Sequence, residues 1–159
     1  MIWNTDPLAA NYRSLLIATG LTLALCLSAR TQAGSGDSKV FWSLPVRERE
    51  KVIRTYKLDE QLDLYLQGMR SEPPDMGLAD VVAANGREII PQVLQRLERE
   101  HSDFDRVSLI YLLSRAGTCY EVRKDEAWLT AVRNAVASME TLAGKDEGEE
   151  SLKNIESCR

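Results

Sequence analysis

The sequence predicts an all-α protein built from antiparallel helix pairs. Apolar residues recur at helical spacing in successive segments, for example at Leu58, Leu62, Tyr65, Leu66 and Met69. No segment shows the strict alternation of apolar and polar residues that is typical of half-buried strands. Stretches with proline or glycine divide the helical segments, so neighbouring helices are expected to fold back on one another.

The first predicted helices lie on either side of a proline-rich loop. A helix is expected to begin at Pro45, because proline is well suited to the first turn of a helix. The stripe that ends at Met69 forms the next helix. Pro73 and Pro74 then predict a loop, "SEPPDMG", since proline blocks the helix and lacks a backbone donor. The apolar segment "LADVVAANG" follows as a short helix, with Gly86 as its left-handed stop.

Two further helical segments follow. "REIIPQVLQRLERE" must place Pro91 in the first turn of its helix. "SDFDRVSLIYLLSRAG" is expected to be capped by Ser102 or Asp103 and to end at Gly117. Apolar residues cover nearly the whole circumference of this second helix. We therefore expect it to be the central and most buried helix of the domain.

The 159 residues are enough for one domain of ordinary size. We expect residues 44–143 to form a single helical domain, whose last helix, residues 125–143, carries an apolar stripe. Residues 1–33 are expected to be a targeting segment, and residues 34–43, which include "GSGDSK", a flexible leader. Residues 144–159 are expected to be an acidic tail.

The N-terminal segment has the features of a signal peptide. Residues 14–29 carry no charge, whereas a membrane-spanning helix needs about 20 apolar residues, with a lower limit near 17. Arg13 supplies a positive flank, and Thr31 and Ala33 are small residues at signal-peptidase spacing. The predicted cut follows Ala33, and a cut after Ala29 is the alternative. The remaining chain would then work in the bacterial periplasm or an equivalent exported space.

Other interpretations of this segment remain open. An uncleaved segment 14–29 would anchor the protein in a membrane. Lipidation at Cys26 would need a small residue before the cysteine, and Leu25 stands there instead. A buried helix of a cytosolic domain would normally carry polar residues on one side, which this segment lacks.

One part of the chain resembles a known repeat. The segment 86–117, "GREIIPQVLQRLEREHSDFDRVSLIYLLSRAG", has a glycine, then "IIPxVLxxL", a polar turn with Asp, and a second helix with "LIYLL" that ends at a glycine. In this it resembles one unit of a HEAT repeat, whose length is about 40–47 residues. The resemblance implies that the helix pairs stack as a short HEAT-like solenoid. An irregular helical bundle is the alternative.

Removal of the signal segment would leave two of the three cysteines, Cys119 and Cys158. In an exported protein an even pair of cysteines usually forms a disulfide. Such a bridge would close a loop of roughly 40 residues, pin the tail to the domain and stabilise it by about 3–4 kcal/mol. The alternatives are two free thiols, or a bridge between two copies through Cys158.

The sequence assigns no catalytic residue, metal ligand or cofactor, and we do not expect an enzyme. Its one histidine, His101, stands among carboxylates in "EREHSDFD", so a metal site or a His–carboxylate pair is conceivable. A solvated turn between helices is favoured, since zinc sites want three or four converging ligands. Cys119 and His101 lie at opposite ends of a predicted helix, about 22 Å apart.

Charge and hydropathy narrow the classes of partner. A net charge of −4 and a pI of about 5.1 argue against nucleic acid, whose binding proteins carry a basic face. The mean hydropathy of −0.27 excludes a polytopic membrane protein, so membrane contact is expected only through an uncleaved N-terminal segment. Stacked helix pairs present a broad surface, and a protein partner is therefore expected.

The sequence also suggests where such a partner binds. Pro73 and Pro74 make their loop stiff, and Met76 offers an adaptable apolar contact. Trp42 would be a further contact if it is exposed. The alternative function is an inhibitor or immunity-type protein that blocks a secreted enzyme, since an acidic face can enter a basic cleft and steer association. An acidic patch converging on one loop would favour the inhibitor, and a long groove would favour the interaction module.

Overall fold

The computed structural model describes residues 34–159, with side chains from residue 38 onward. The chain divides into two compact units, Met1–Ser43 and Leu44–Arg159. The predicted signal segment, its cleavage sites and the alternative anchor lie outside the described residues. Among the helices of the described part, none is both long and apolar enough to cross a membrane.

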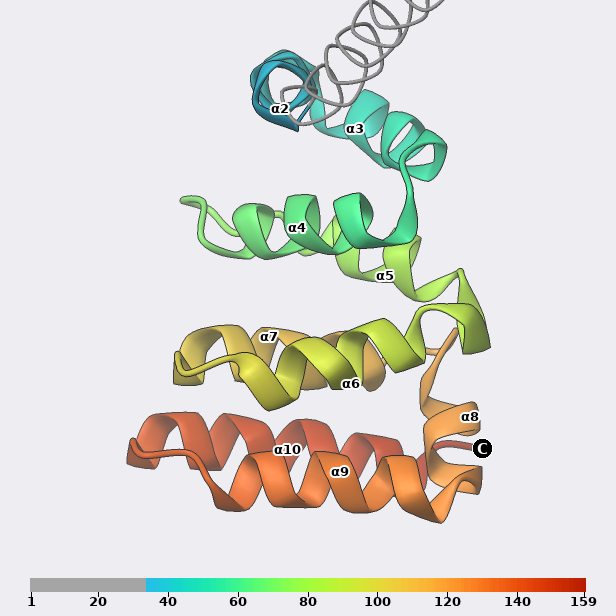
Figure 1. Cartoon of the computed structure of the whole chain (residues 1–159), viewed down its shortest axis with the longest axis vertical. Coiled ribbons are helices and arrows are strands. Elements are labelled where there is room, and N and C mark those ends of the chain that lie inside the picture. Colours follow the sequence, from blue (N-terminus) through green and yellow to red (C-terminus); the bar gives the residue numbers. More distant parts are fainter. Residues whose placement is uncertain (1–33) are drawn as a thin grey trace, which may run out of the picture. The chain divides into compact units, whose positions relative to one another are not determined.

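In the first unit, residues Gly34–Ser43 form helix α2, where the sequence predicted a flexible leader (Figure 1). Phe41 is fully buried, and its ring lies edge-on to that of Trp42 at a centroid distance of 5.0 Å. The glycines and serines that suggested flexibility occupy only the beginning of this segment. Phe41 and Trp42, at the end of the segment, give the helix the apolar side chains that its glycines and serines lack.

The second unit confirms the predicted fold class. Its described residues form helices and connecting turns and contain no β-strand. The helices are α3 (Val46–Val52), α4 (Leu58–Met69), α5 (Gly77–Ala83), α6 (Ile90–Arg99), α7 (Asp103–Leu113), α8 (Cys119–Lys124), α9 (Glu126–Ala137) and α10 (Leu142–Ser157), with 3-10 turns η2 (Ile53–Thr55) and η3 (Gly86–Glu88).

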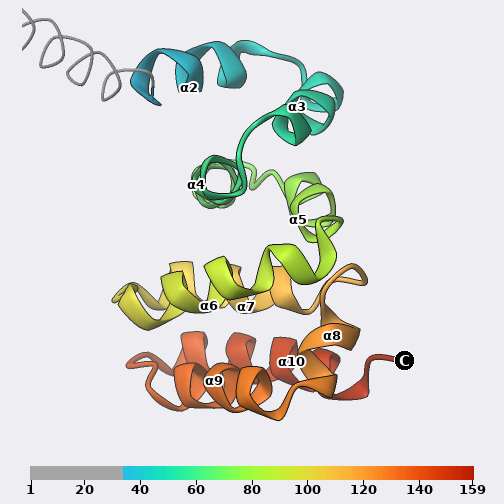
Figure 2. The same ribbon diagram turned by 45° about the vertical axis from the view of Figure 1, so that its right-hand side comes forward.

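The antiparallel helix pairs of the prediction are present. Helices α4 and α5, α6 and α7, and α9 and α10 form successive hairpins (Figure 1). Helices α4, α6 and α9 pack on one another in one layer, and α5, α7 and α10 in the other. In Figure 2, α4 is seen end-on while α6 and α9 run across the view, so the first hairpin is rotated relative to the others. Helix α3 packs on α5, and α8 packs on α9 and α10.

Helix α7 is the central helix, as the sequence predicted. It packs against α4, α5, α6, α9 and α10. Leu109, Ile110, Leu112 and Leu113 on this helix are all completely buried. The hydroxyl of Tyr65, on α4, donates a hydrogen bond of 2.6 Å to the carbonyl oxygen of Ser108 in this core. Burial raises the pKa of the Tyr65 phenol, because its ionised form would lose the solvation of water.

The predicted helix boundaries at Pro45, Gly86, Pro91 and Ser102 are found, whereas α7 ends at Leu113 and not at the predicted Gly117. Pro45 directly precedes α3, and Pro91 lies in the first turn of α6, where its missing N–H costs no intrahelical bond. Gly86 follows α5 with a φ of +59°, the left-handed conformation that glycine adopts without a Cβ penalty. Ser102 caps α7, its hydroxyl accepting a hydrogen bond from the backbone N–H of Asp105 at 3.5 Å.

The C-terminal segment is a correction to the prediction. The expected acidic tail, residues 144–159, lies for the most part in helix α10, which packs against α7, α8 and α9. The prediction of one helix over residues 125–143 is also wrong at its C-terminal end, because α9 ends at Ala137. Thr141 then caps α10, its hydroxyl accepting a hydrogen bond of 3.0 Å from the backbone N–H of Gly144.

The residues on the buried face of α10 explain why this helix was not predicted from the sequence. Gly144, Gly148, Ser151 and Ile155 are spaced at i, i+4, i+7 and i+11 and are buried. Three of these residues are small, so the stripe lacks the large apolar side chains by which a helix is usually recognised. A Cβ added to Gly148 would lie 3.0 Å from Met139 Sδ, tighter than most contacts of this kind. The small residues therefore let α10 approach its neighbours closely.

Candidate functional site

The turns of the three hairpins lie along one edge of the second unit, on the left in Figure 1. This edge is termed the hairpin edge and comprises residues 70–76, 100–104 and 138–142. Each turn exposes one large apolar side chain where the second helix of the pair begins. The exposed fractions are 43% for Met76, 49% for Phe104 and 81% for Leu142. The hairpin edge is therefore a first candidate for partner contact.

Two ion pairs hold the first turn of this edge. Arg70 donates to both carboxylate oxygens of Asp105, with Nε at 2.9 Å from Oδ1, and so joins the end of α4 to the beginning of α7. This hydrogen bonding raises the pKa of Arg70. Arg49, on α3, lies 2.7 Å from Asp75, whose side chain is only 7% exposed. The loop between α4 and α5 is thus fixed at its start and at its end.

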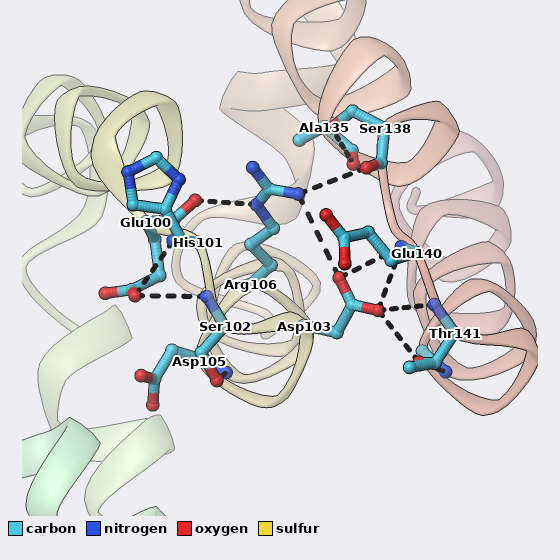
Figure 3. Close-up of polar contacts among 11 residues, drawn as sticks. Glu100, His101, Ser102, Asp103, Asp105, Arg106, Ala135, Ser138, Glu140 and Thr141 are labelled. Atoms are coloured by element: carbon cyan, nitrogen blue, oxygen red, sulfur yellow. Dashed lines mark hydrogen bonds and ion pairs between the residues drawn. The ribbon is translucent and has the colours of Figure 1, made fainter.

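Asp103 joins the other two turns (Figure 3). Its carboxylate accepts hydrogen bonds from the backbone N–H groups of Glu140 and Thr141 and from the Thr141 hydroxyl, at 3.0, 2.7 and 2.8 Å. These bonds, the one from the Thr141 backbone foremost, hold the pKa of Asp103 below its ordinary value. The turn between α9 and α10 is therefore ordered by a side chain of α7.

The residues predicted as partner contacts fall in two places. Pro73, Pro74 and Met76 are exposed together on the hairpin edge. Trp42 lies in the other unit, on α2, and is half-buried. Phe104 was not recognised from the sequence. Leu142 fell within the helix predicted over residues 125–143, because the break between α9 and α10 was not foreseen.

His101 lies on the exposed turn between α6 and α7. Its backbone N–H donates to Glu100 Oε1 at 3.0 Å. Among the residues that the structure describes, no group of three His, Cys, Asp or Glu side chains is placed to hold a metal ion. Cys119 lies in α8, beyond the far end of α7, and is bonded to Cys158. Cys119 and His101 therefore do not form a nucleophile–base pair.

The predicted disulfide joins the beginning of α8 to the end of α10. The Cα atoms of Cys119 and Cys158 are 6.0 Å apart, within the usual range for a disulfide, and the residues are 39 positions apart in sequence. The bridge lies at the edge opposite the hairpin edge. Helix α10 is thus held at its first turn by Asp103 and at its last by the disulfide.

Two hollows lie on either side of α6. The α4–α6 hollow has a volume of about 490 Å³, and the α6–α9 hollow about 370 Å³. The first is lined by Asp59, Leu62, Asp63, Gln92, Gln95, Arg96 and Arg99. The second is lined by Leu94, Leu97, Glu98, Arg106, Ala131, Asn134, Ala135 and Ser138. Helix α6 and these two hollows are termed the α6 surface.

The two hollows differ in chemistry. The α4–α6 hollow carries charges of both signs, and Arg96 lies 2.8 Å from Asp63 in an exposed ion pair. Such a pair contributes little to stability and leaves both side chains able to rearrange. The α6–α9 hollow has an apolar part, which includes Leu94 and Leu97, and one cation, Arg106.

Comparison with protein-family models, with curated proteins and with solved structures finds no significant match to this chain. The resemblance of residues 86–117 to a HEAT unit therefore remains a prediction, although the segment does form the hairpin of α6 and α7.

Proposed function

We propose that the second unit is a protein-binding module and that its partner lies along the α6 surface. The observation that carries the proposal is the pair of hollows on either side of one helix, which together offer an extended surface. A groove of this kind is what stacked helix pairs present to partners. Side chains of both charges along it suit the polar rim of a protein interface, and the leucines suit its core.

The same proposal places the protein in an exported, oxidising space. The pairing of Cys119 with Cys158 supports this, because disulfides persist in such compartments and are rare in the cytosol. Cleavage after Ala33 would release the unit, and retention of residues 14–29 would anchor it. The intact mass from the native host, with and without reduction and alkylation, tests both points. Two free thiols in that mass would contradict the oxidising compartment.

Site-specific photo-crosslinking in the native host tests the binding function. A photoreactive residue at Gln95, exposed on α6, should give an adduct of discrete mass. The matched control is the same residue at Glu149, which is exposed on α10. The proposal expects an adduct from Gln95 and none of that mass from Glu149. Equal adducts from both positions, or none from Gln95, would contradict it.

A second candidate function is an inhibitor or immunity-type protein that blocks a secreted enzyme. The observation that favours it lies on the hairpin edge, where Glu72 and Glu140 are exposed near the ends of turns that also expose apolar side chains. An apolar tip among carboxylates suits a basic cleft. A photoreactive residue at Phe104 separates the two functions. An adduct from Phe104 but not from Gln95 would favour the inhibitor.

A further inference from the structure

Arg106 occupies an unusual position at the α6–α9 hollow. Its side chain is only 14% exposed and is held from two turns (Figure 3). Nε donates to the carbonyl oxygen of Glu100 at 2.8 Å, and Nη1 donates to that of Ser138 at 3.2 Å. The guanidinium is therefore fixed in place before any ligand arrives.

Within the described residues this guanidinium forms one long ion pair and donates a hydrogen bond to no carboxylate. The nearest carboxylate oxygen that pairs with it is Asp103 Oδ1, 3.9 Å from Nη1, and that carboxylate already accepts hydrogen bonds from Glu140 and Thr141. Within the described residues, Nη2 makes no hydrogen bond, as Figure 3 also shows. Other arginines of the unit, Arg70, Arg115 and Arg133, each donate directly to a carboxylate.

Arg106 lines the α6–α9 hollow, and the other lining residues define what can lie beside its guanidinium. Leu94, Leu97, Ala131 and Ala135 give the hollow an apolar part, and Glu98 and Asn134 add polar groups. Its volume of about 370 Å³ is in the range of small-ligand sites, which are mostly apolar with a few placed polar groups. An apolar group with one carboxylate matches this combination, since arginine binds carboxylates through charge-assisted hydrogen bonds.

From this complementarity we infer that the α6–α9 hollow binds the C-terminal residue of a polypeptide whose last side chain is apolar. The terminal carboxylate accepts a hydrogen bond from Arg106 Nη2, and the side chain packs on Leu94 and Leu97. Glu98 adds an acceptor for the peptide N–H and disfavours ligands with several negative charges. The inference rests on the proposed protein-binding function and specifies one end of the partner.

A titration of the full chain with three probes tests this inference by NMR chemical shifts. The probes are acetyl-Ala-Ala-Leu with a free carboxylate, the same peptide as its C-terminal amide, and free leucine. The acid should bind about tenfold or more tightly than the amide, because the amide loses the charge-assisted bond. Equal binding of acid and amide, or binding of neither, would overturn the inference. If leucine binds as tightly as the peptide, the ligand of the hollow is a free amino acid, and the inference of a polypeptide C-terminus is overturned.

Variants make the result specific to this hollow. Arg106→Gln should abolish the preference for the acid, but Arg106 also joins two turns, and this variant can lose stability. Ala135→Leu fills the hollow while Arg106 is kept, and it should abolish peptide binding in a folded protein. Arg123→Gln, on the exposed surface of α8, is the matched control and should bind as the wild type does. Failure of the peptide to bind while Gln95 still gives its adduct would remove this inference alone and leave the protein-binding function standing.

Discussion

Asp103 and Thr141 are 38 positions apart in sequence and are joined by two hydrogen bonds to one carboxylate oxygen. Asp103 Oδ2 accepts from the Thr141 backbone N–H at 2.7 Å and from its hydroxyl at 2.8 Å. The same hydroxyl accepts from the backbone N–H of Gly144 at 3.0 Å and so caps α10. A side chain at the start of α7 therefore determines where the last helix of the unit begins.

Replacing this carboxylate should destabilise the unit in a pH-dependent way. Asp103→Asn should lower the melting temperature by a few degrees at neutral pH, since the neutral amide binds the Thr141 and Glu140 donors less strongly. The pKa of Asp103 is lowered in the folded protein, so its contribution is present above its unfolded value of about 3.8 and is lost as the pH falls below it. Thermal unfolding of both proteins between pH 3 and pH 7 checks this.

Asp146→Asn, on the exposed face of α10, is the control for the loss of one surface charge and should change the melting temperature little. A difference between wild type and Asp103→Asn that persists unchanged down to pH 3 would contradict the role given to the charge.

The disulfide should stabilise the unit mainly by restricting its unfolded state. Replacement of both Cys119 and Cys158 by serine should lower the free energy of unfolding by about 3–4 kcal/mol, as expected for a loop of this length. The urea midpoint would then fall by about 1–3 M. Reduction of the wild type should give the same shift. An unfolding midpoint that does not respond to reductant would show that the bridge is absent or carries no stability.

Substitution by alanine should change the stability of the unit differently at two glycines, Gly117 and Gly148. A Cβ on Gly117 would lie 2.1 Å from the carbonyl oxygen of Ala83, a backbone atom at the end of α5. Gly117→Ala should therefore cost about 2–3 kcal/mol of stability. A Cβ on Gly148 meets the flexible side chain of Met139, and alanine gains about 1 kcal/mol of helix propensity there. Gly148→Ala should stay close to wild type in urea unfolding, and a larger loss there than at Gly117 would contradict these contacts.

The buried phenol of Tyr65 should make stability sensitive to alkaline pH. Tyr65→Phe removes a buried hydrogen bond to Ser108 and should cost about 1–2 kcal/mol at neutral pH. The pKa of Tyr65 is raised in the folded protein, so the wild type loses stability as the pH rises above the ordinary value of 10.0, where the unfolded chain ionises. The variant lacks this loss, and the two unfolding curves should approach one another above pH 10. Curves that stay equally far apart would contradict it.

The parts of the fold that were predictable are those with large apolar stripes and distinctive turn residues. The stripe of α4, the left-handed Gly86 and the first-turn Pro91 each follow from local physics that needs no tertiary information. The central place of α7 followed from apolar residues around its whole circumference. The pairing of Cys119 with Cys158 was predictable on the expectation that residues 1–33 are removed, which would leave only two cysteines.

The rest depended on contacts between segments distant in sequence. Helix α10 is bounded by a cap at Thr141 that Asp103 completes, and its buried stripe consists largely of glycine and serine, which propensity alone assigns to loops. The two hollows at α6 arise from packing between three hairpins and have no sequence signature. Arg106 resembles any surface arginine in the sequence, and only its place between two turns distinguishes it.

In the proposed function, one protein partner lies along the whole α6 surface and occupies both hollows. The direct test is the yield of photo-adduct from Gln95, beside the α4–α6 hollow, after Ala135→Trp has filled the α6–α9 hollow. We expect a folded variant in which the adduct yield falls severalfold, because one partner spans both hollows. An unchanged yield from Gln95 would show that the two hollows do not belong to one binding surface and would contradict the proposed function.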